Sequence, residues 1–162
     1  MTNTDSAHKS YWEISEVVFG IPLLISLVLQ WAVPLSLPQG ILRQALIPVG
    51  AILFLLGLTL IVLARGEFAR FGQSTEPGHP TSKIVMTGVF SISRNPLYLG
   101  IVIALTGLGL ALNFIWVLGL LVPAMFLCHY ILIAPEEVYL QKKFGKEYLA
   151  YLDSVHRWLG RK

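Results

Sequence analysis

One uncharged stretch decides the fold of this chain. Residues 97–134 read LYLGIVIALTGLGLALNFIWVLGLLVPAMFLCHYILIA, thirty-eight residues without an Asp, Glu, Lys or Arg. A transmembrane helix needs about 20 apolar residues, so this stretch is too long for one span and long enough for two short ones. Asn113 carries its only amide side chain and follows two glycines, which predicts a turn there. We therefore expect a helical hairpin with arms at residues 96–112 and 114–134.

The two arms differ in their expected packing. Small residues four apart in the first arm, Gly100 with Ala104 and Gly107 with Ala111, would let a neighbouring helix approach closely. Pro123 is expected to bend the second arm.

Two further apolar runs precede the hairpin, at residues 17–33 and 45–64. The second has no charge over twenty residues, which at about 1.5 Å per residue matches the ~30 Å hydrocarbon layer. The chain is 55% hydrophobic and 13% charged, with a mean hydropathy of +0.69, a balance that suits a bilayer better than water. We predict an all-α integral membrane bundle of four transmembrane helices. It would form one domain, 1–162, with two spans in 1–64 and a polar loop, the hairpin and a C-terminal tail in 65–162.

The basic residues predict the orientation of these spans. Four spans place both termini on one side, and eleven of the twelve Lys and Arg residues fall on that side. Arg43 alone lies between the first two spans. By the positive-inside rule, both termini are cytoplasmic, as in a multi-pass protein of a prokaryotic inner membrane.

Composition argues against several classes of function. A net charge of +3, with its basic residues distributed by topology, does not favour nucleic-acid binding. Cys128 is the only cysteine and lies in an apolar run, so we expect a buried small residue, and neither a disulfide nor a metal site. The polar first ten residues are not a secretory signal peptide.

The tail, residues 135–162, carries one apolar, aromatic face at helical spacing. This face should lie along the membrane surface or cap the polar loop, and the sequence leaves both open. Its members are Leu140, Phe144, Tyr148, Tyr151, Val155 and Trp158.

Polar residues stand at both ends of the hairpin. Before it, Asn95 is a good N-cap and Pro96 a good first helical residue, so the exposed amides there could bind a carboxylate or phosphate beside Arg94. After it, Glu136 and Glu137 occupy the first turn of a new helix. Facing Arg94, this acidic pair would also suit a ligand with an ammonium or sulfonium charge, and we expect a contact between Arg94 and Glu137.

Plainer interpretations of both segments stay open. Arg94 could extend to lipid phosphates while Asn95 and Pro96 merely start a helix. The acidic pair could serve only to complement the helix dipole.

Taken together, these segments resemble the isoprenylcysteine carboxyl methyltransferase and phospholipid methyltransferase family. The resemblance rests on Thr87-Gly88-Val89-Phe90, on Ser91-Ile92-Ser93-Arg94-Asn95-Pro96-Leu97-Tyr98-Leu99-Gly100, on the hairpin, and on Glu136-Glu137 with the tail pattern ending in Arg157-Trp158. It covers roughly residues 75–158. It implies a membrane enzyme that transfers the methyl group of S-adenosylmethionine to a lipid-like or prenylated amphiphilic acceptor. No glycine-rich nucleotide motif after a strand is present, so loop and tail would hold the cofactor.

Carried over by position, the resemblance also implies roles for single residues. Glu136 would take the ammonium group of the cofactor, with Arg94, Glu137 and Tyr98 as the catalytic residues. The expected cofactor-binding residues are Lys83, Ile84, Val85, Thr87, Gly88, Phe90, Asn95, Pro96, Tyr98 and Glu136, with Ser82 and Val89 beside them.

The chain departs from the family pattern at two positions. Asn95 stands where many relatives have a histidine, which removes an imidazole base. Leu132 stands where prenylcysteine enzymes have an arginine, and His129, the nearest polar group, reads more readily as a core residue. The loop 66–80 has the composition of a mobile lid whose His79 could reach the cofactor, although a solvated connector fits it as well.

Two other functions remain as alternatives. A non-catalytic membrane scaffold or subunit would use the aromatic tail as an interfacial anchor. A small transporter would need ionisable residues inside the spans, where the chain has only Gln30, Asn113 and His129 as polar side chains of note. Membrane lipids are expected partners, and the sequence leaves the acceptor and the oligomeric state open.

Overall fold

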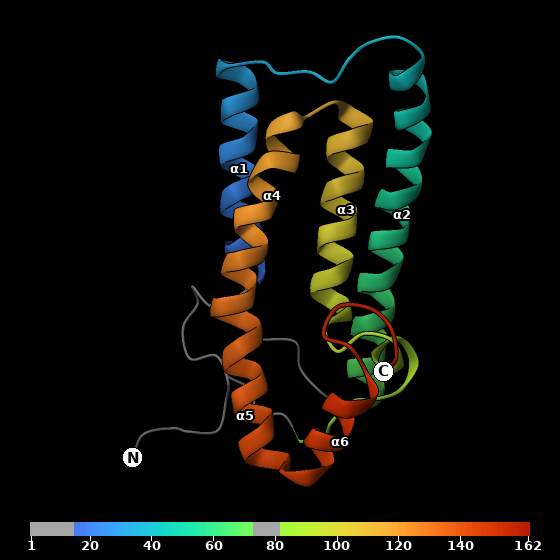
Figure 1. The fold of residues 1–162 in the computed structure, drawn as a ribbon, viewed down its shortest axis with the longest axis vertical. Helices are drawn as coiled ribbons and strands as arrows, with labels where there is room; N and C mark the ends of the chain where they lie inside the picture. The colour runs from blue at the N-terminus through green and yellow to red at the C-terminus, as the bar shows by residue number, and fades with distance from the viewer. Residues whose placement is uncertain (1–14, 73–81) are drawn as a thin grey trace.

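The computed structural model describes residues 15–72 and 82–162 (Figure 1). This part of the chain is all-α, and its only β feature is an isolated bridge between Val155 and Arg161. The helices are α1 (Ser15–Ala32), α2 (Ile41–Arg70), a 3-10 turn η1 (Gly88–Ser91), α3 (Pro96–Leu112), α4 (Ile115–Leu127), a π-helical turn η2 (Cys128–Ile133), α5 (Ala134–Phe144) and α6 (Lys146–Ser154).

The hairpin of α3 and α4 forms the middle of the bundle. α1 packs against α4 and α2 against α3, so the four helices stand side by side, and α5 and α6 lie at one end (Figure 1). Three helices of the described chain are long and apolar enough to cross a membrane: Ser15–Ala32, Ile41–Arg70 and Ile115–Phe144, the last formed by α4, η2 and α5 in succession. α3 is apolar but has only 17 residues. The all-helical fold is therefore confirmed for the described residues, and the length and composition of these three helices suit a membrane protein.

Asn113 makes the turn of the hairpin, as predicted. Its backbone is left-handed, with φ 62°, a conformation that Asn adopts more readily than most residues. Its side chain also fixes the opposite loop, because Oδ1 accepts a hydrogen bond of 2.7 Å from the backbone N–H of Leu37. One residue thus ends α3 and holds the α1–α2 connection.

Close packing of α2 on α3 depends on glycine from both helices. A Cβ at Gly57 would lie 2.5 Å from the carbonyl oxygen of Gly100, and a Cβ at Gly50 would lie 2.6 Å from that of Gly107. The predicted close approach at Gly100 and Gly107 is therefore confirmed. The role of Gly50 and Gly57 as the facing surface on α2 was not predicted.

Two helices extend well beyond their predicted ends. α2 continues to Arg70 beyond the expected end at residue 64, because charged residues are compatible with a helix once it has left the apolar layer. The second arm does not stop at residue 134, since η2 leads directly into α5 and the helix runs on to Phe144. Pro123 lies inside α4.

Arg43 lies at the end of the bundle opposite α5 and α6. Its Nη1 donates to the carbonyl oxygen of Leu110 at 2.7 Å and its Nη2 to that of Ala111 at 2.6 Å. These are among the last carbonyls of α3, which lack partners within the helix. Arg43 therefore caps the C-terminus of α3, where a positive charge is favourable.

Candidate functional site

The C-terminal tail folds back under the bundle and covers the loop before α3. Gly145, with φ 53°, separates α5 from α6, and the side chains of Tyr148, Tyr151 and Val155 are buried against Ile84. The hydroxyl of Tyr151 donates a hydrogen bond of 2.6 Å to the carbonyl oxygen of Phe90. Of the two predicted positions for the aromatic face, the structure has the one that caps the loop.

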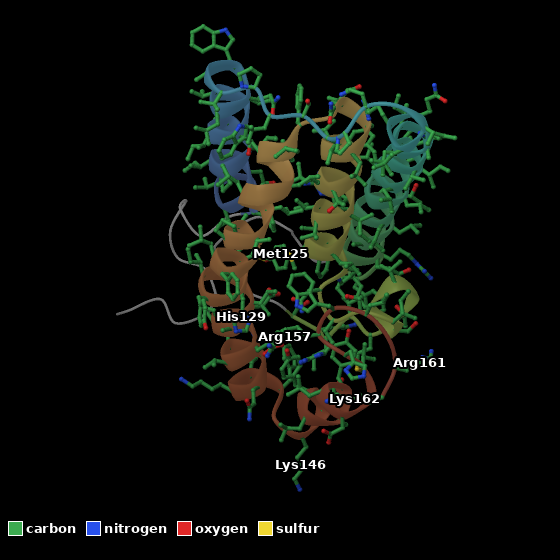
Figure 2. The ribbon with its side chains drawn as sticks, turned by 45° about the horizontal axis from the view of Figure 1, so that its top comes forward. Met125, His129, Lys146, Arg157, Arg161 and Lys162 are labelled. Atoms are coloured by element: carbon green, nitrogen blue, oxygen red, sulfur yellow. The ribbon has the colours of Figure 1, made fainter. Side chains whose placement is uncertain are left out.

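The segment after α6 is bonded to the residues that precede α3. The N–H of Gly160 donates to the carbonyl oxygen of Ile92 at 2.7 Å, and the N–H of Arg94 donates to that of His156 at 3.2 Å. Figure 2 shows Arg157, Arg161 and Lys162 on this segment, at the same end of the molecule as Lys146. The last residues of the sequence therefore fix the backbone on either side of Arg94.

Asn95 precedes α3, as predicted for an N-cap, but its side chain makes no capping hydrogen bond. Its Nδ2 instead donates to the carbonyl oxygen of Arg157 at 3.0 Å. The capping role expected for this side chain is wrong, because the returning tail offers a backbone acceptor that competes for the same amide group. Pro96 is the first residue of α3, as expected.

Arg94 and Glu137 form the contact that the sequence predicted. Nη1 of Arg94 lies 3.1 Å from Oε1 of Glu137, and the two side chains are only 8% and 18% exposed. Arg157 binds the same carboxylate from the tail, with Nε 2.9 Å from Oε1 and Nη2 2.7 Å from Oε2. This two-point bond raises the pKa of the Arg157 guanidinium. Two arginines therefore share one carboxylate.

The guanidinium of Arg94 is incompletely satisfied. Within residues 15–72 and 82–162, its buried Nε and Nη1 atoms have no hydrogen-bond partner, since the approach to Glu137 is close but poorly aligned. A buried N–H without a partner is costly, so such a group is an effective donor to an acceptor that arrives from outside.

Glu136 lies beside Glu137 at the start of α5, and Tyr98 lies close to Glu136. The Glu136 carboxyl is within electrostatic range of the Tyr98 phenol and of Cys128, which is fully buried as predicted. Tyr148 borders the same group: burial, and next the Glu137 charge, raise its pKa to about 12, while the Arg94 guanidinium acts in the opposite direction. Residues from α3, α5 and α6 thus meet at one place.

The loop residues predicted to hold a cofactor divide into two sets. The side chains of Val85 and Phe90 are buried with Ala64 of α2, and that of Ile84 packs against the tail. The side chains of Lys83 and Thr87 and the backbone of Gly88 are exposed. Tyr151 joins this loop to the acidic group, because it binds Phe90 and its ring lies 6.2 Å from that of Tyr148. His79 and most of the expected lid lie outside the described residues.

Two charged residues in this region were not among the predicted site residues. Arg157 was noted only as part of a motif, and nothing local in the sequence reveals that it reaches Glu137. Glu67 was assigned to the loop, yet it lies near the end of α2, 11% exposed, and accepts hydrogen bonds from Thr87 and Arg70.

The described residues contain no cluster of three or more His, Cys, Asp or Glu side chains that could hold a metal ion. His129 is half-buried in η2 and packs edge-on against Tyr130, with ring centroids 4.8 Å apart. Leu132 is fully buried with Val18 and Phe19 of α1. The position that has arginine in prenylcysteine enzymes is therefore core here.

Comparison with protein families gives one match. A family model described as phospholipid methyltransferase matches residues 46–147, from the first third of α2 into the start of α6. This match confirms the resemblance found in the sequence. Comparison with curated proteins and with solved structures gave no match.

Proposed function

Because the chain belongs to the phospholipid methyltransferase family, whose model matches more than half of it, we propose that it transfers a methyl group from S-adenosylmethionine to a lipid-like or prenylated amphiphilic acceptor. Family membership makes it a membrane methyltransferase. The cofactor, the acceptor class and the cytoplasmic location of the reaction are our proposal.

The buried guanidinium of Arg94 is the observation that carries this proposal. Its Nε atom has no hydrogen-bond partner in the described chain, and its Nη1 atom has only the ion pair with Glu137, whose neighbour Glu136 adds a second carboxyl. With Glu137 and Arg157 included, the group has two guanidiniums and two carboxyl groups. An amino-acid zwitterion, such as the methionine part of the cofactor, complements that arrangement: Arg94 would bind its carboxylate and Glu136 its ammonium group.

The remaining predicted residues would hold the rest of the cofactor along the loop. Lys83, Thr87 and Gly88 offer exposed surface for an adenosine, while Val85, Phe90 and Pro96 act from the core by holding that surface in place. The complete set is Lys83, Ile84, Val85, Thr87, Gly88, Phe90, Asn95, Pro96, Tyr98 and Glu136.

The protein's contribution to such a reaction is positioning and exclusion of water. S-adenosylmethionine supplies a methyl group already activated on a sulfonium. Arg94, held by Glu137, would fix one end of the bound molecule, and Tyr98 would face it from α3. The buried rings of Tyr148 and Tyr151 would exclude water on the side covered by α6. Asn95 replaces the histidine of many relatives and bonds to the tail, so it supplies no base.

We further propose that all four helices of the bundle span the membrane, with both termini cytoplasmic, in a prokaryotic inner membrane. α3 measures about 25 Å at about 1.5 Å per residue, slightly less than the hydrocarbon layer. Arg43 caps α3 at one end of the bundle, whereas Arg94 and Arg157 lie at the other with the tail. The acceptor would enter from the inner leaflet, and the apolar surroundings of Leu132 favour an amphiphile other than prenylcysteine.

One experiment tests the proposal without assuming an acceptor. Purified protein in nanodiscs is incubated with labelled S-adenosylmethionine and total membrane lipid, and the labelled product is identified. We expect one lipid class to become labelled. Arg94→Ala should lose turnover, whereas Arg65→Ala, which removes a surface arginine that is 57% exposed, should keep it.

Binding provides the second test. Glu136→Gln should weaken calorimetric binding of S-adenosylhomocysteine while the helical content stays unchanged. Unchanged affinity in this variant would refute the role of Glu136. A wild-type protein with no saturable binding and no labelled product would support the scaffold alternative.

A further inference from the structure

Glu67 is a buried acid outside the group formed by Arg94, Glu136 and Glu137. It lies one turn before the end of α2, and its side chain is 11% exposed, whereas that of Arg70, its partner on the same helix, is 74% exposed. Both carboxylate oxygens are occupied: Oε1 accepts from Nη1 of Arg70 at 2.8 Å, and Oε2 accepts from Oγ1 of Thr87 at 2.7 Å. A residue of α2 is therefore bonded to the loop twenty positions later.

The carboxylate also packs directly on the backbone of that loop. Gly88 has a left-handed conformation, with φ 55°, and a Cβ there would lie 2.7 Å from Cδ and from Oε1 of Glu67. A side chain at position 88 would therefore require the Glu67 carboxylate to move. Glu67 therefore fixes both the side chain of Thr87 and the main chain of Gly88.

Other contacts hold the far end of the same turn without Glu67. The ring of Phe90 packs edge-on against Phe68 of α2, with centroids 4.9 Å apart, and is buried with Ala64 and Val85. From the opposite side, Tyr151 bonds to the carbonyl oxygen of Phe90. Loss of the Glu67 carboxylate should therefore leave the turn folded on α2 and free only its exposed corner, Thr87 and Gly88.

We propose that Glu67 is a positioning residue: it sets the conformation of the Thr87–Gly88 corner so that this exposed edge presents a fixed surface to the adenosine of the cofactor. The inference rests on the proposed function, because it takes the corner to be part of the cofactor site. Glu67 acts through this corner rather than by contact with the cofactor, since its side chain is only 11% exposed. It gives α2, otherwise a membrane helix, a role in the site.

A graded set of variants in the full chain, reconstituted in nanodiscs, tests this role. Glu67→Ala removes the acceptor, and Glu67→Gln keeps an oxygen that accepts from Thr87. Thr87→Val removes the donor from the other side. Arg70→Ala is the matched control, because it removes the exposed partner and leaves the Thr87 bond in place. Each variant is checked for helical content before its binding of S-adenosylhomocysteine is measured by calorimetry.

We expect Glu67→Ala and Thr87→Val each to weaken binding about tenfold, as the loss of one hydrogen bond to a charged group does. The double variant should be little weaker than either, because both substitutions remove the same contact. Glu67→Gln should recover most of the affinity, and Arg70→Ala should stay within about twofold of the wild type. In turnover assays, KM for S-adenosylmethionine should rise in Glu67→Ala while kcat changes by less than about twofold.

The outcomes separate this inference from the function it rests on. If the wild type does not bind S-adenosylhomocysteine, the proposed function fails, and the positioning role with it. If the wild type binds and folded Glu67→Ala binds equally well, the positioning role alone is refuted. A fall in kcat at constant KM would also refute it, since that pattern indicates a general structural effect on the reaction.

Discussion

Removal of the Glu137 carboxylate should destabilise the protein more than removal of either arginine that binds it. Glu137 accepts two hydrogen bonds from Arg157 and lies 3.1 Å from Nη1 of Arg94. In Glu137→Ala the two guanidiniums remain beside each other with no carboxylate between them. The energetic cost of losing the carboxylate differs between the two guanidiniums, because their side chains differ in exposed fraction.

Exposure gives the size of the effect. The Arg157 side chain is 38% exposed and can turn to water, so Arg157→Ala should cost about 1 kcal/mol. The Arg94 side chain is only 8% exposed, so it cannot turn to water. Loss of one partner from a buried pair costs about 3–5 kcal/mol, and we expect Glu137→Ala to lie near 3, because Glu137 is not wholly buried. The double variant Arg94→Met with Glu137→Ala leaves no buried charge from this pair, so it should be more stable than Glu137→Ala by about 1–2 kcal/mol.

Equilibrium unfolding in mixed micelles, with increasing sodium dodecyl sulfate, measures these differences in free energy. Trp158 packs on the core cluster of α1 and α4 and provides a fluorescence signal near the site. Two results would refute the reasoning. One is a loss below about 1 kcal/mol in Glu137→Ala, and the other is a double variant no more stable than Glu137→Ala.

Three further predictions concern other parts of the molecule. Gly57→Ala should cost about 2 kcal/mol in the same unfolding assay, because the new methyl group would overlap the carbonyl of Gly100, whereas Gly66→Ala, with nothing within 4 Å, should be neutral or stabilising. Asn113→Ala should be more destabilising than Asn113→Gly by about 1 kcal/mol, because glycine keeps the left-handed backbone that alanine resists; equal losses would show that only the side-chain bond matters. Since burial raises the pKa of Tyr148 to about 12, its contribution to stability is complete below pH 10 and is lost as the pH rises towards 12. Tyr148→Phe should therefore flatten the pH dependence of unfolding in that interval, and an unchanged slope would contradict the shift.

The hairpin could be predicted because its signal is local. An uncharged stretch of nearly two spans, interrupted by a single amide side chain, has few other solutions in a bilayer, and Asn113 indeed makes the turn. The contact between Arg94 and Glu137 followed from the same logic. The hairpin brings its two ends together, so the basic residue before it and the acidic residue after it meet.

The rest of the site depends on segments that meet only after folding. Arg157 reaches Glu137 because α6 reverses the chain at Gly145, and no pattern around Arg157 records that reversal. In the sequence, Glu67 is an ordinary charged residue at the end of a span. Only the structure shows that Thr87 binds its carboxylate. Asn95 has the sequence of a cap but bonds to the returning tail, because the choice between acceptors is made by tertiary structure.

The π-helical turn η2 has a consequence for the angular phase of the long helix. A π-helix holds more residues per turn than an α-helix, so it shifts the faces that follow it relative to those before it. If residues 128–133 adopted regular α-helical geometry with none removed, α5 would instead be rotated by about 100° about its axis relative to α4. The apolar surface of α4 would keep its neighbours, while Glu137 would turn away from Arg94. An irregularity six residues long thus keeps the lipid-facing and charged parts of one helix in register.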